Sequence, residues 1–298
     1  MSHQRGHGDH PNHHDAQGAG GDLADLLDLD AEVMSEQLHA VRTDIETLAD
    51  SPVRSILDLG AGTGSGSFGL LRHFTDAHVL AIDASEEMLE RLRRRAEQLG
   101  LSDRVSTLCA DLDKTVPGPD GADLAWASAS LHHLADPDRT LAQLAAAIRP
   151  GGLLVVIELA GLPRFVPDHA PGGAVESRAH ALLAADRAAD MPTMGSDWGP
   201  RLTRAGLVVE LDRTILVDLT LSIPAVGAYA AATLTRIRER VADRLDPTDR
   251  GSLDALLAGG TSDVRRRTDL RVSTERRLWI ARRPAAATPQ AELAADAV

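Results

Sequence analysis

The sequence predicts an α/β protein built on an open, doubly wound parallel sheet. Five short apolar runs in the first half of the chain alternate with stretches in which apolar residues recur at helical spacing. Strands that alternate with helices in this way form βαβ units, and the helices cover both faces of the parallel sheet. Because the crossovers between parallel strands are right-handed, few topologies remain for such a chain.

Each expected strand ends in a turn, and most of these turns lead into a helical pattern. The strands are Ser55–Leu59, His78–Ile82, Val105–Cys109, Asp123–Ala127 and Gly152–Ile157. The helical patterns after the first, second and fourth strands are Phe68–Phe74, Glu86–Leu99 and Asp138–Ile148. Ahead of the first strand, Leu29–Leu48 also carries apolar residues at helical spacing and is expected to form a helix.

After the fifth strand the alternation gives way to two insertions. Residues 160–197 hold four prolines around a helical stretch, Val175–Ala189, and residues 220–262 form a helical insertion broken at Asp246-Pro247. Helix Trp198–Ala205 and strands Leu207–Asp218 and Leu270–Ala281 complete the pattern.

We therefore divide the chain into four parts. Residues 1–21 hold five of the twelve histidines and almost nothing apolar, so we expect a disordered leader. Residues 22–50 form an N-terminal helical cap, and residues 51–283 form one domain with insertions at about 160–197 and 220–262. Residues 284–298, rich in alanine, are expected to be a disordered tail.

Composition disfavours several classes of function. The formal net charge of −13 repels phosphate backbones, so we expect no nucleic-acid partner. No apolar run is long enough to span a bilayer and the N-terminus is unlike a secretory signal, so we expect a cytoplasmic protein without a membrane partner. No Asp/Asn triad suggests a magnesium site, and we expect no metal. The 220–262 insertion is a candidate homodimer surface or part of a lid.

A glycine-rich turn follows the first strand, in Asp58-Leu59-Gly60-Ala61-Gly62-Thr63-Gly64. Alternate glycines allow a sharp turn and let a ligand approach the backbone where a Cβ would collide. The helix that follows offers free N–H groups to an anionic group. The spacing differs from the G-x-G-x-x-G of dinucleotide-binding proteins.

Two carboxylates follow the next two strands. Asp83 ends the second strand about 20 residues beyond the glycines, where an acidic residue can accept the hydroxyls of a ribose. Asp111 follows the third strand and can accept a hydrogen bond from an adenine amino group. The carboxyl ends of parallel strands share one crevice, so we expect both side chains to face the glycine-rich turn.

These residues resemble the motifs of class I S-adenosylmethionine (SAM)-dependent methyltransferases, especially small bacterial enzymes that act on small molecules. The resemblance covers residues 51–160, including Leu131-His132-His133-Leu134 and Arg149-Pro150-Gly151-Gly152. It implies a Rossmann-like seven-stranded sheet whose last strand is antiparallel, SAM as cofactor, and S-adenosylhomocysteine as product. The cofactor-binding residues that it implies are Asp58, Gly60, Ala61, Gly62, Gly64, Asp83, Ala84, Met88, Asp111, Leu112, Ala129 and Ser130.

Methyl transfer is a displacement on an activated carbon, so the protein mainly aligns the acceptor and excludes water. His132 and His133 follow the fourth strand and Glu158 ends the fifth, and we take these three as candidate catalytic or acceptor-contacting residues. The structural alternative is that they pack and cap the turn. We expect Leu29–Leu48 and Val175–Ala189 to form a lid over the acceptor. The candidate apolar wall residues, for which core packing is an equal alternative, are Met34, Met191, Met194 and Trp198.

The predicted function is methyl transfer from SAM to a small-molecule acceptor of bacterial specialised metabolism, with O-methylation ahead of N- or C-methylation. Two alternatives stay open: a SAM-binding scaffold or non-methylating protein, and a protein methyltransferase. A base-methylating enzyme is disfavoured because no Asn/Asp-Pro-Pro-aromatic turn follows the fourth strand. A dehydrogenase is disfavoured by the glycine spacing and the lack of a Tyr-x-x-x-Lys pair.

Overall fold

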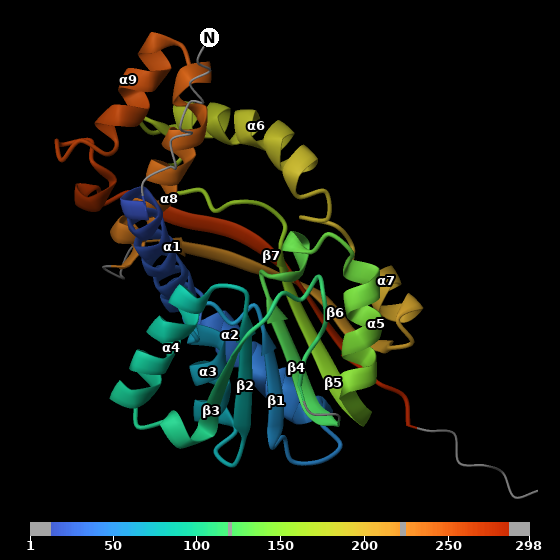
Figure 1. The fold of residues 1–298 in the computed structure, drawn as a ribbon. Coiled ribbons are helices and arrows are strands. Elements are labelled where there is room, and N and C mark those ends of the chain that lie inside the picture. Colours follow the sequence, from blue (N-terminus) through green and yellow to red (C-terminus); the bar gives the residue numbers. More distant parts are fainter. Residues whose placement is uncertain (1–12, 119–120, 221–224, 286–298) are drawn as a thin grey trace, which may run out of the picture.

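A computed structural model describes residues 13–118, 121–220 and 225–285, which form a seven-stranded sheet with helices on both faces (Figure 1). The strands are β1 (Ser55–Leu59), β2 (His78–Asp83), β3 (Val105–Cys109), β4 (Ala122–Ser128), β5 (Ile148–Leu159), β6 (Val208–Thr220) and β7 (Arg271–Arg282). Their order is β3-β2-β1-β4-β5-β7-β6. Neighbours from β3 to β5 are parallel, and β7 is antiparallel to β5 and β6. The predicted fold class is confirmed.

Nine α-helices accompany the strands in the described residues. They are α1 (His13–Val33), α2 (Ser35–Leu48), α3 (Ser65–His73), α4 (Glu86–Gln98), α5 (Pro137–Ala147), α6 (Gly173–Asp190), α7 (Gly199–Arg204), α8 (Ala225–Val241) and α9 (Pro247–Ala255). None of these helices has both the length and the apolar character needed to cross a bilayer.

The first helix begins earlier than expected. We predicted disorder over residues 1–21, whereas α1 begins at His13. Extending a helix that has already nucleated adds one hydrogen bond per residue, so a polar segment can continue it. Residues 1–12, and residues 286–298 of the predicted tail, lie outside the described residues.

Local sequence signals set several helix ends. Ser85 caps α4 by accepting the backbone N–H of Met88 at 3.3 Å. The Asp246-Pro247 break predicted in the second insertion is the start of α9, where the Asp246 carboxylate accepts the N–H of Asp249 at 2.9 Å. Proline in the first turn fits because a helix has no use for that N–H.

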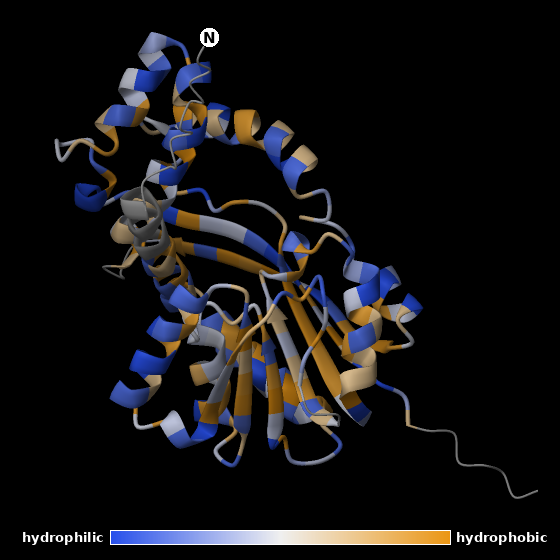
Figure 2. Ribbon diagram, viewed as in Figure 1, coloured by the Kyte–Doolittle hydropathy of each residue, from blue (hydrophilic) through white to orange (hydrophobic). Residues whose placement is uncertain are grey.

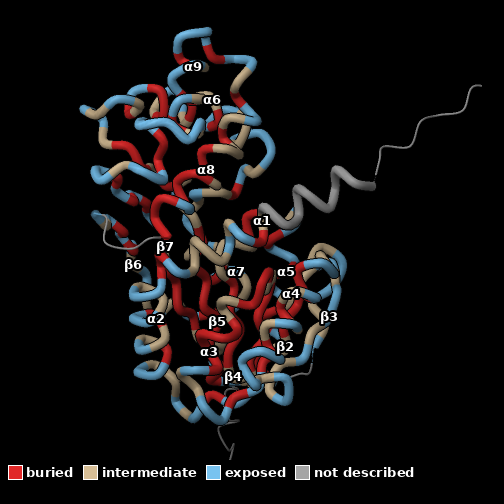
Figure 3. Tube along the Cα trace, turned by 90° about the vertical axis from the view of Figure 1, so that its left-hand side faces the viewer, coloured by how far each residue is buried: buried red, intermediate tan, exposed pale blue. Residues whose placement is uncertain are grey.

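The sheet buries a different apolar cluster on each face. Successive strand residues point to opposite sides, so Ile56 joins the larger cluster and Leu57 the smaller. Helices α2, α3 and α4 pack on the larger cluster, and α5 and α7 on the smaller. Apolar residues therefore concentrate in the strands (Figure 2), and the inner strands β1, β4 and β5 lie buried between helices whose outer faces are exposed (Figure 3). Each fully buried Leu or Ile contributes roughly 1.5–3 kcal/mol.

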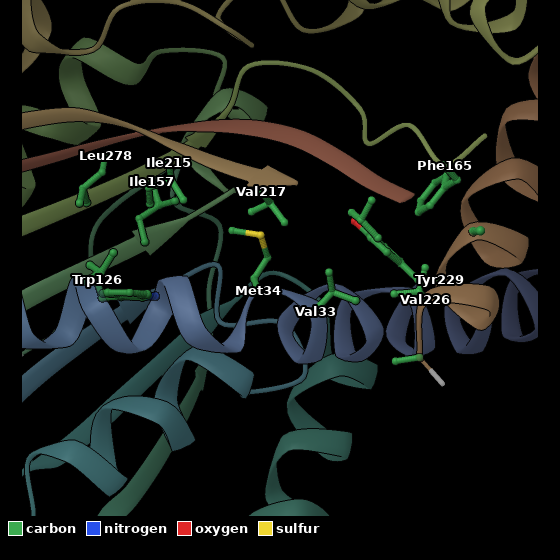
Figure 4. Close-up of a cluster of buried hydrophobic side chains, with 14 of the residues drawn as sticks. Val33, Met34, Trp126, Ile157, Phe165, Ile215, Val217, Val226, Tyr229 and Leu278 are labelled. Carbon is green, nitrogen blue, oxygen red and sulfur yellow. The ribbon is translucent and has the colours of Figure 1, made fainter. Parts of the chain in front are cut away.

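The helices of the two insertions lie beyond the ends of the parallel strands, where the β6–β7 ribbon extends to meet α6, α8 and α9 (Figure 1). The larger apolar cluster is continuous through this region. Val33 and Met34 lie between Trp126 on one side and Tyr229 on the other, and so join the sheet to the insertion helices (Figure 4).

Helix α1 is fixed by two aspartates. The Asp28 carboxylate accepts hydrogen bonds from Thr63 at 2.6 Å, Arg91 at 2.7 Å and Arg95 at 2.8 Å. Partial burial opposes ionisation of Asp28, but these hydrogen bonds and the arginine charges prevail, and its pKa is lowered. Two residues later, Asp30 accepts hydrogen bonds from groups on α8 and β7. The helix is thereby tied to both halves of the molecule.

Replacing Asp28 by Asn should loosen α1. The variant loses charge-assisted hydrogen bonds to two arginines, each worth about 1.5–3 kcal/mol, so we expect the amides of α1 to exchange with solvent at least about tenfold faster. Hydrogen-exchange mass spectrometry of the α1 peptides measures this. Asp25→Asn is the control, since Asp25 is exposed and pairs with Arg91 alone. Equal protection of the α1 amides in Asp28→Asn and wild type would show that Asp28 does not hold α1 in place.

Candidate active site

A cavity of about 590 Å³ opens where β1, β2, β3 and β4 end, beneath α1. This volume lies within the roughly 300–1,000 Å³ of small-molecule sites. Of the twelve predicted cofactor-binding residues, all but Gly64 line the cavity. Helix α1 supplies one wall through Leu23, Leu27, Asp30 and Ala31.

Two glycines of the turn have different structural roles. Gly60 has a φ of +67°, and a Cβ on it would lie 2.5 Å from the Cβ of Ser130. Only glycine therefore lets β1 and the turn after β4 meet at the cavity. Gly64 has a φ of +84° and begins α3, where a Cβ would lie 2.6 Å from Leu92 on α4. Gly64 therefore allows α3 to pack closely against α4, and it lies outside the cavity wall.

Asp83 joins the glycine-rich turn to the end of β2. One carboxylate oxygen accepts the N–H of Gly62 at 2.8 Å, and the other accepts the N–H of Ser85 at 2.8 Å. Each carboxylate oxygen has a second lone pair, so Asp83 can still accept hydrogen bonds from the hydroxyl groups of a ligand.

Asp111 is exposed at the cavity edge, and the hydrogen bond from the backbone N–H of Asp113, followed by Lys114, holds its pKa below the usual range. It therefore presents an ionised carboxylate there at neutral pH.

Asp58 is buried at the base of the cavity. Burial raises the pKa of its carboxyl, a hydrogen bond from Ser67 at 2.5 Å opposes the rise, and the Asp83 charge adds to it, so that the pKa is about 6. A cationic group in the cavity would favour the ionised form of this carboxyl.

The buried carboxylate of Glu158 holds the turn after β4. One oxygen accepts the backbone N–H of Ser130 at 3.2 Å and of Leu131 at 2.8 Å, and the other lies 2.6 Å from Nδ1 of His132. Within this turn Ala129 has a φ of +53°, a conformation that costs a residue with a Cβ about 1 kcal/mol. The hydrogen bonds to Glu158 and that of the Ala129 N–H to Ile157, at 2.7 Å, offset this strain.

The three candidate catalytic residues lie together but differ in access to the cavity. His133 is exposed and lines it, whereas His132 and Glu158 are buried outside its wall. The two imidazole rings lie 4.1 Å apart between centroids. Partial desolvation, followed by the charge of His132, lowers the pKa of His133. His133 is therefore a neutral imidazole at pH 7 and can accept a proton.

Of the two segments expected to cover the acceptor, only one lines the cavity. The segment Leu29–Leu48 contributes Asp30, Ala31 and Leu38 to the cavity wall, but Val175–Ala189 contributes no residue. Helix α6 is instead held to the loop after β5, where Glu176 accepts the N–H groups of Phe165 and Val166.

None of the candidate wall residues Met34, Met191, Met194 and Trp198 lines the cavity. Met34 and Trp198 are core residues, as the alternative interpretation held.

Several cavity residues escaped the sequence analysis, among them Asp30, Trp126 and Arg276. Arg276 had a detectable signal: it occupies the buried face of β7, between Thr274 and Leu278, where an arginine is out of pattern. In the described part of the chain, no group of three or more His, Cys, Asp or Glu side chains is placed to hold a metal ion.

Residues 56–152 match the family model of a methyltransferase domain. The methyltransferase GfsG of Streptomyces halstedii is 35% identical over 43% of this chain and 44% of its own length. The 27-O-demethylrifamycin SV methyltransferase of Amycolatopsis mediterranei is 34% identical over 45% of this chain and 54% of its own. The chain thus spans about half the length of these curated relatives.

A solved structure matches over more of the chain. A candidate type II methyltransferase from Anaeromyxobacter dehalogenans is 25% identical and superimposes with a TM-score of 0.57, covering 83% of this chain and 97% of that one. The similarity therefore extends beyond the segment that carries the motifs.

Glu158→Gln should destabilise the protein by about 2–3 kcal/mol. The amide has one acceptor oxygen in place of two and directs N–H groups at buried N–H donors, which leaves those donors unsatisfied. Urea denaturation measures the free energy of unfolding. Glu97→Gln, at an exposed position on α4, is the matched control and should change stability by less than about 0.5 kcal/mol. Equal stability of the two variants would remove the role given to Glu158.

Proposed function

The chain carries a class I, SAM-dependent methyltransferase domain, and on that premise we propose that the protein transfers the methyl group of SAM to a small-molecule acceptor. The observation that carries the proposal is the convergence of predicted cofactor residues from four strand ends on one cavity, which α1 closes with apolar side chains. A cavity of this size beneath a helix suits a small acceptor better than a protein side chain presented by a partner.

The residues of the cavity wall fit SAM in charge. SAM supplies a methyl group on a positively charged sulfonium, and the cavity wall is rich in carboxylates, including Asp58, Asp83, Glu87 and Asp111. In this assignment Asp83 holds the ribose, Asp111 and Leu112 hold the adenine, and the turn from Gly60 to Gly62 holds the methionine portion.

His133 is the proposed general base. A neutral imidazole in the cavity can take the proton of an acceptor hydroxyl, which must be lost for an oxygen to become methylated. His132 and Glu158 then act indirectly, by fixing the turn that presents His133. Because a hydroxyl acceptor must lose its proton, a base at this position favours O-methylation. The rifamycin relative is likewise named for a methylated oxygen. A role in bacterial specialised metabolism, a cytoplasmic location and a homodimer stay predictions.

Asp83→Ala should abolish cofactor binding. The variant loses the proposed ribose acceptor and releases the N–H groups of Gly62 and Ser85 that shape the turn, so we expect SAM and S-adenosylhomocysteine to bind at least about a hundredfold more weakly. Isothermal titration calorimetry measures both ligands, with NADH as a ligand that should not bind. Asp103→Ala, at an exposed site on the surface, should bind like wild type. A folded wild-type protein that binds neither ligand would refute the proposal.

Methyl transfer itself can be detected while the acceptor is still unidentified. Wild-type protein incubated with trideuteromethyl SAM and a bacterial metabolite extract should yield a deuterated small molecule in mass spectrometry. Cofactor binding without any labelled product from extracts of several actinomycetes would favour the SAM-binding scaffold.

For that product, His133→Gln should lower turnover about a hundredfold or more while cofactor affinity stays constant. Because the pKa of His133 is lowered from 6.5, wild-type turnover should rise with pH as the imidazole loses its proton, with a midpoint below 6.5, and level off by neutral pH. The pH–rate profile of both proteins checks this. A profile of the same shape in His133→Gln would exclude His133 as the base.

A further inference from the structure

A buried arginine lies in the cavity wall without a role in the proposed chemistry. Arg276 lies on β7 and is only 3% exposed, yet it lines the same cavity as the glycine-rich turn. It belongs to a small polar cluster under α1, in which one Asp30 oxygen accepts hydrogen bonds from Nη2 of Arg276 and from the hydroxyl of Tyr229. Burial and the nearby charge of Asp30 raise the pKa of the Tyr229 hydroxyl, which therefore stays protonated.

The hydrogen-bonding capacity of Arg276 is largely unused. A guanidinium has five N–H donors, and among the described residues only the Asp30 carboxylate and the neighbouring Tyr229 hydroxyl engage those of Arg276. Its Nε–H has no partner in the part of the chain that the structure describes, but this atom is fully buried, so a ligand in the cavity would have to meet the terminal Nη groups. A guanidinium with spare N–H donors in a cavity wall points to a hydrogen-bond acceptor on the ligand.

The charge of the surroundings limits what this acceptor can be. Asp30 already balances the charge of Arg276, and the rest of the wall includes the carboxylates Asp58, Asp83 and Glu87. An anionic ligand would add negative charge to this wall, whereas a carbonyl oxygen accepts a hydrogen bond without bringing any charge. The adjoining side chains of α1, Leu27 and Ala31, are apolar.

We propose that Arg276 is a specificity residue that donates a hydrogen bond to a carbonyl oxygen of an uncharged, largely apolar acceptor. The inference rests on the proposed function and specifies its substrate class: a ketone-bearing molecule whose hydroxyl is methylated. A site built to donate a hydrogen bond discriminates strongly against an analogue without the acceptor atom, because the buried donor is then left unpaired.

Three probes of similar shape test the proposal: acetophenone, ethylbenzene and benzoate. They are titrated into wild-type protein by nitrogen-15 NMR, with and without S-adenosylhomocysteine, and the Nε–H signal of Arg276 is identified by its absence from Arg276→Met. Acetophenone should shift this signal, and ethylbenzene should bind without shifting it. Arg276→Met should weaken acetophenone about tenfold and change ethylbenzene by less than about twofold.

Two further variants control for lost structure. Arg276→Met leaves Asp30 without its charged partner, so Asp30→Asn combined with Arg276→Met removes both charges and should show the same loss for acetophenone. Arg277→Gln alters the neighbouring arginine, which points away from the cavity and pairs with Asp212, and should bind all three probes like wild type.

The outcomes separate this inference from the proposed function. Binding of S-adenosylhomocysteine tests the cofactor site alone. A shift of the Arg276 signal on adding acetophenone supports the inference whether or not S-adenosylhomocysteine binds. Tighter binding of benzoate than of acetophenone would overturn the uncharged class and assign a carboxylate. Failure of acetophenone to bind, or equal losses for acetophenone and ethylbenzene in Arg276→Met, would overturn the role of Arg276.

Discussion

A single buried carboxylate organises the site by accepting two backbone N–H groups and one imidazole from the turn after β4. The acceptor is Glu158, at the end of the neighbouring strand. Its hydrogen bonds hold Ala129 in a left-handed conformation, seat Ser130 against Gly60, and bring His133 into the cavity wall. The turn thus positions both the residues that meet the glycine-rich turn and the imidazole of His133, so an error in its position would misplace both.

Acidity is the second organising property of the site. Carboxylates lie at the ends of three neighbouring strands, in or just after β1, β2 and β3, and they differ in burial. Asp58 is buried and has its pKa raised to about 6, whereas Asp111 is exposed and has its pKa lowered. Asp83 lies between them, and each of its two oxygens accepts a hydrogen bond from a backbone N–H group. A wall of this kind prefers a ligand with positive charge, and the glycines allow that ligand to approach the backbone closely.

The sequence predicted what depends on local pattern and on strand ends. Apolar runs followed by Gly60–Gly64, Asp83 and Asp111 placed the cofactor cavity, because parallel strands bring their carboxyl ends together. The pattern could not distinguish His132 from His133, since a one-residue difference decides which ring meets Glu158. Nor could it pair Asp30 with Arg276, which are 246 residues apart and meet only in the folded chain, where α1 packs against α8.

Helix α1 contacts two separate parts of the cavity wall. Leu27 approaches Gly62 in the glycine-rich turn, while Asp30 contacts Arg276 on β7. A molecule that orders this helix from one of these places has already met part of the entropic cost of ordering it for a molecule at the other. The two occupants are then thermodynamically linked, and each raises the affinity of the other by the same factor. In kinetic terms, such a helix favours sequential loading and slow escape of whichever molecule entered first.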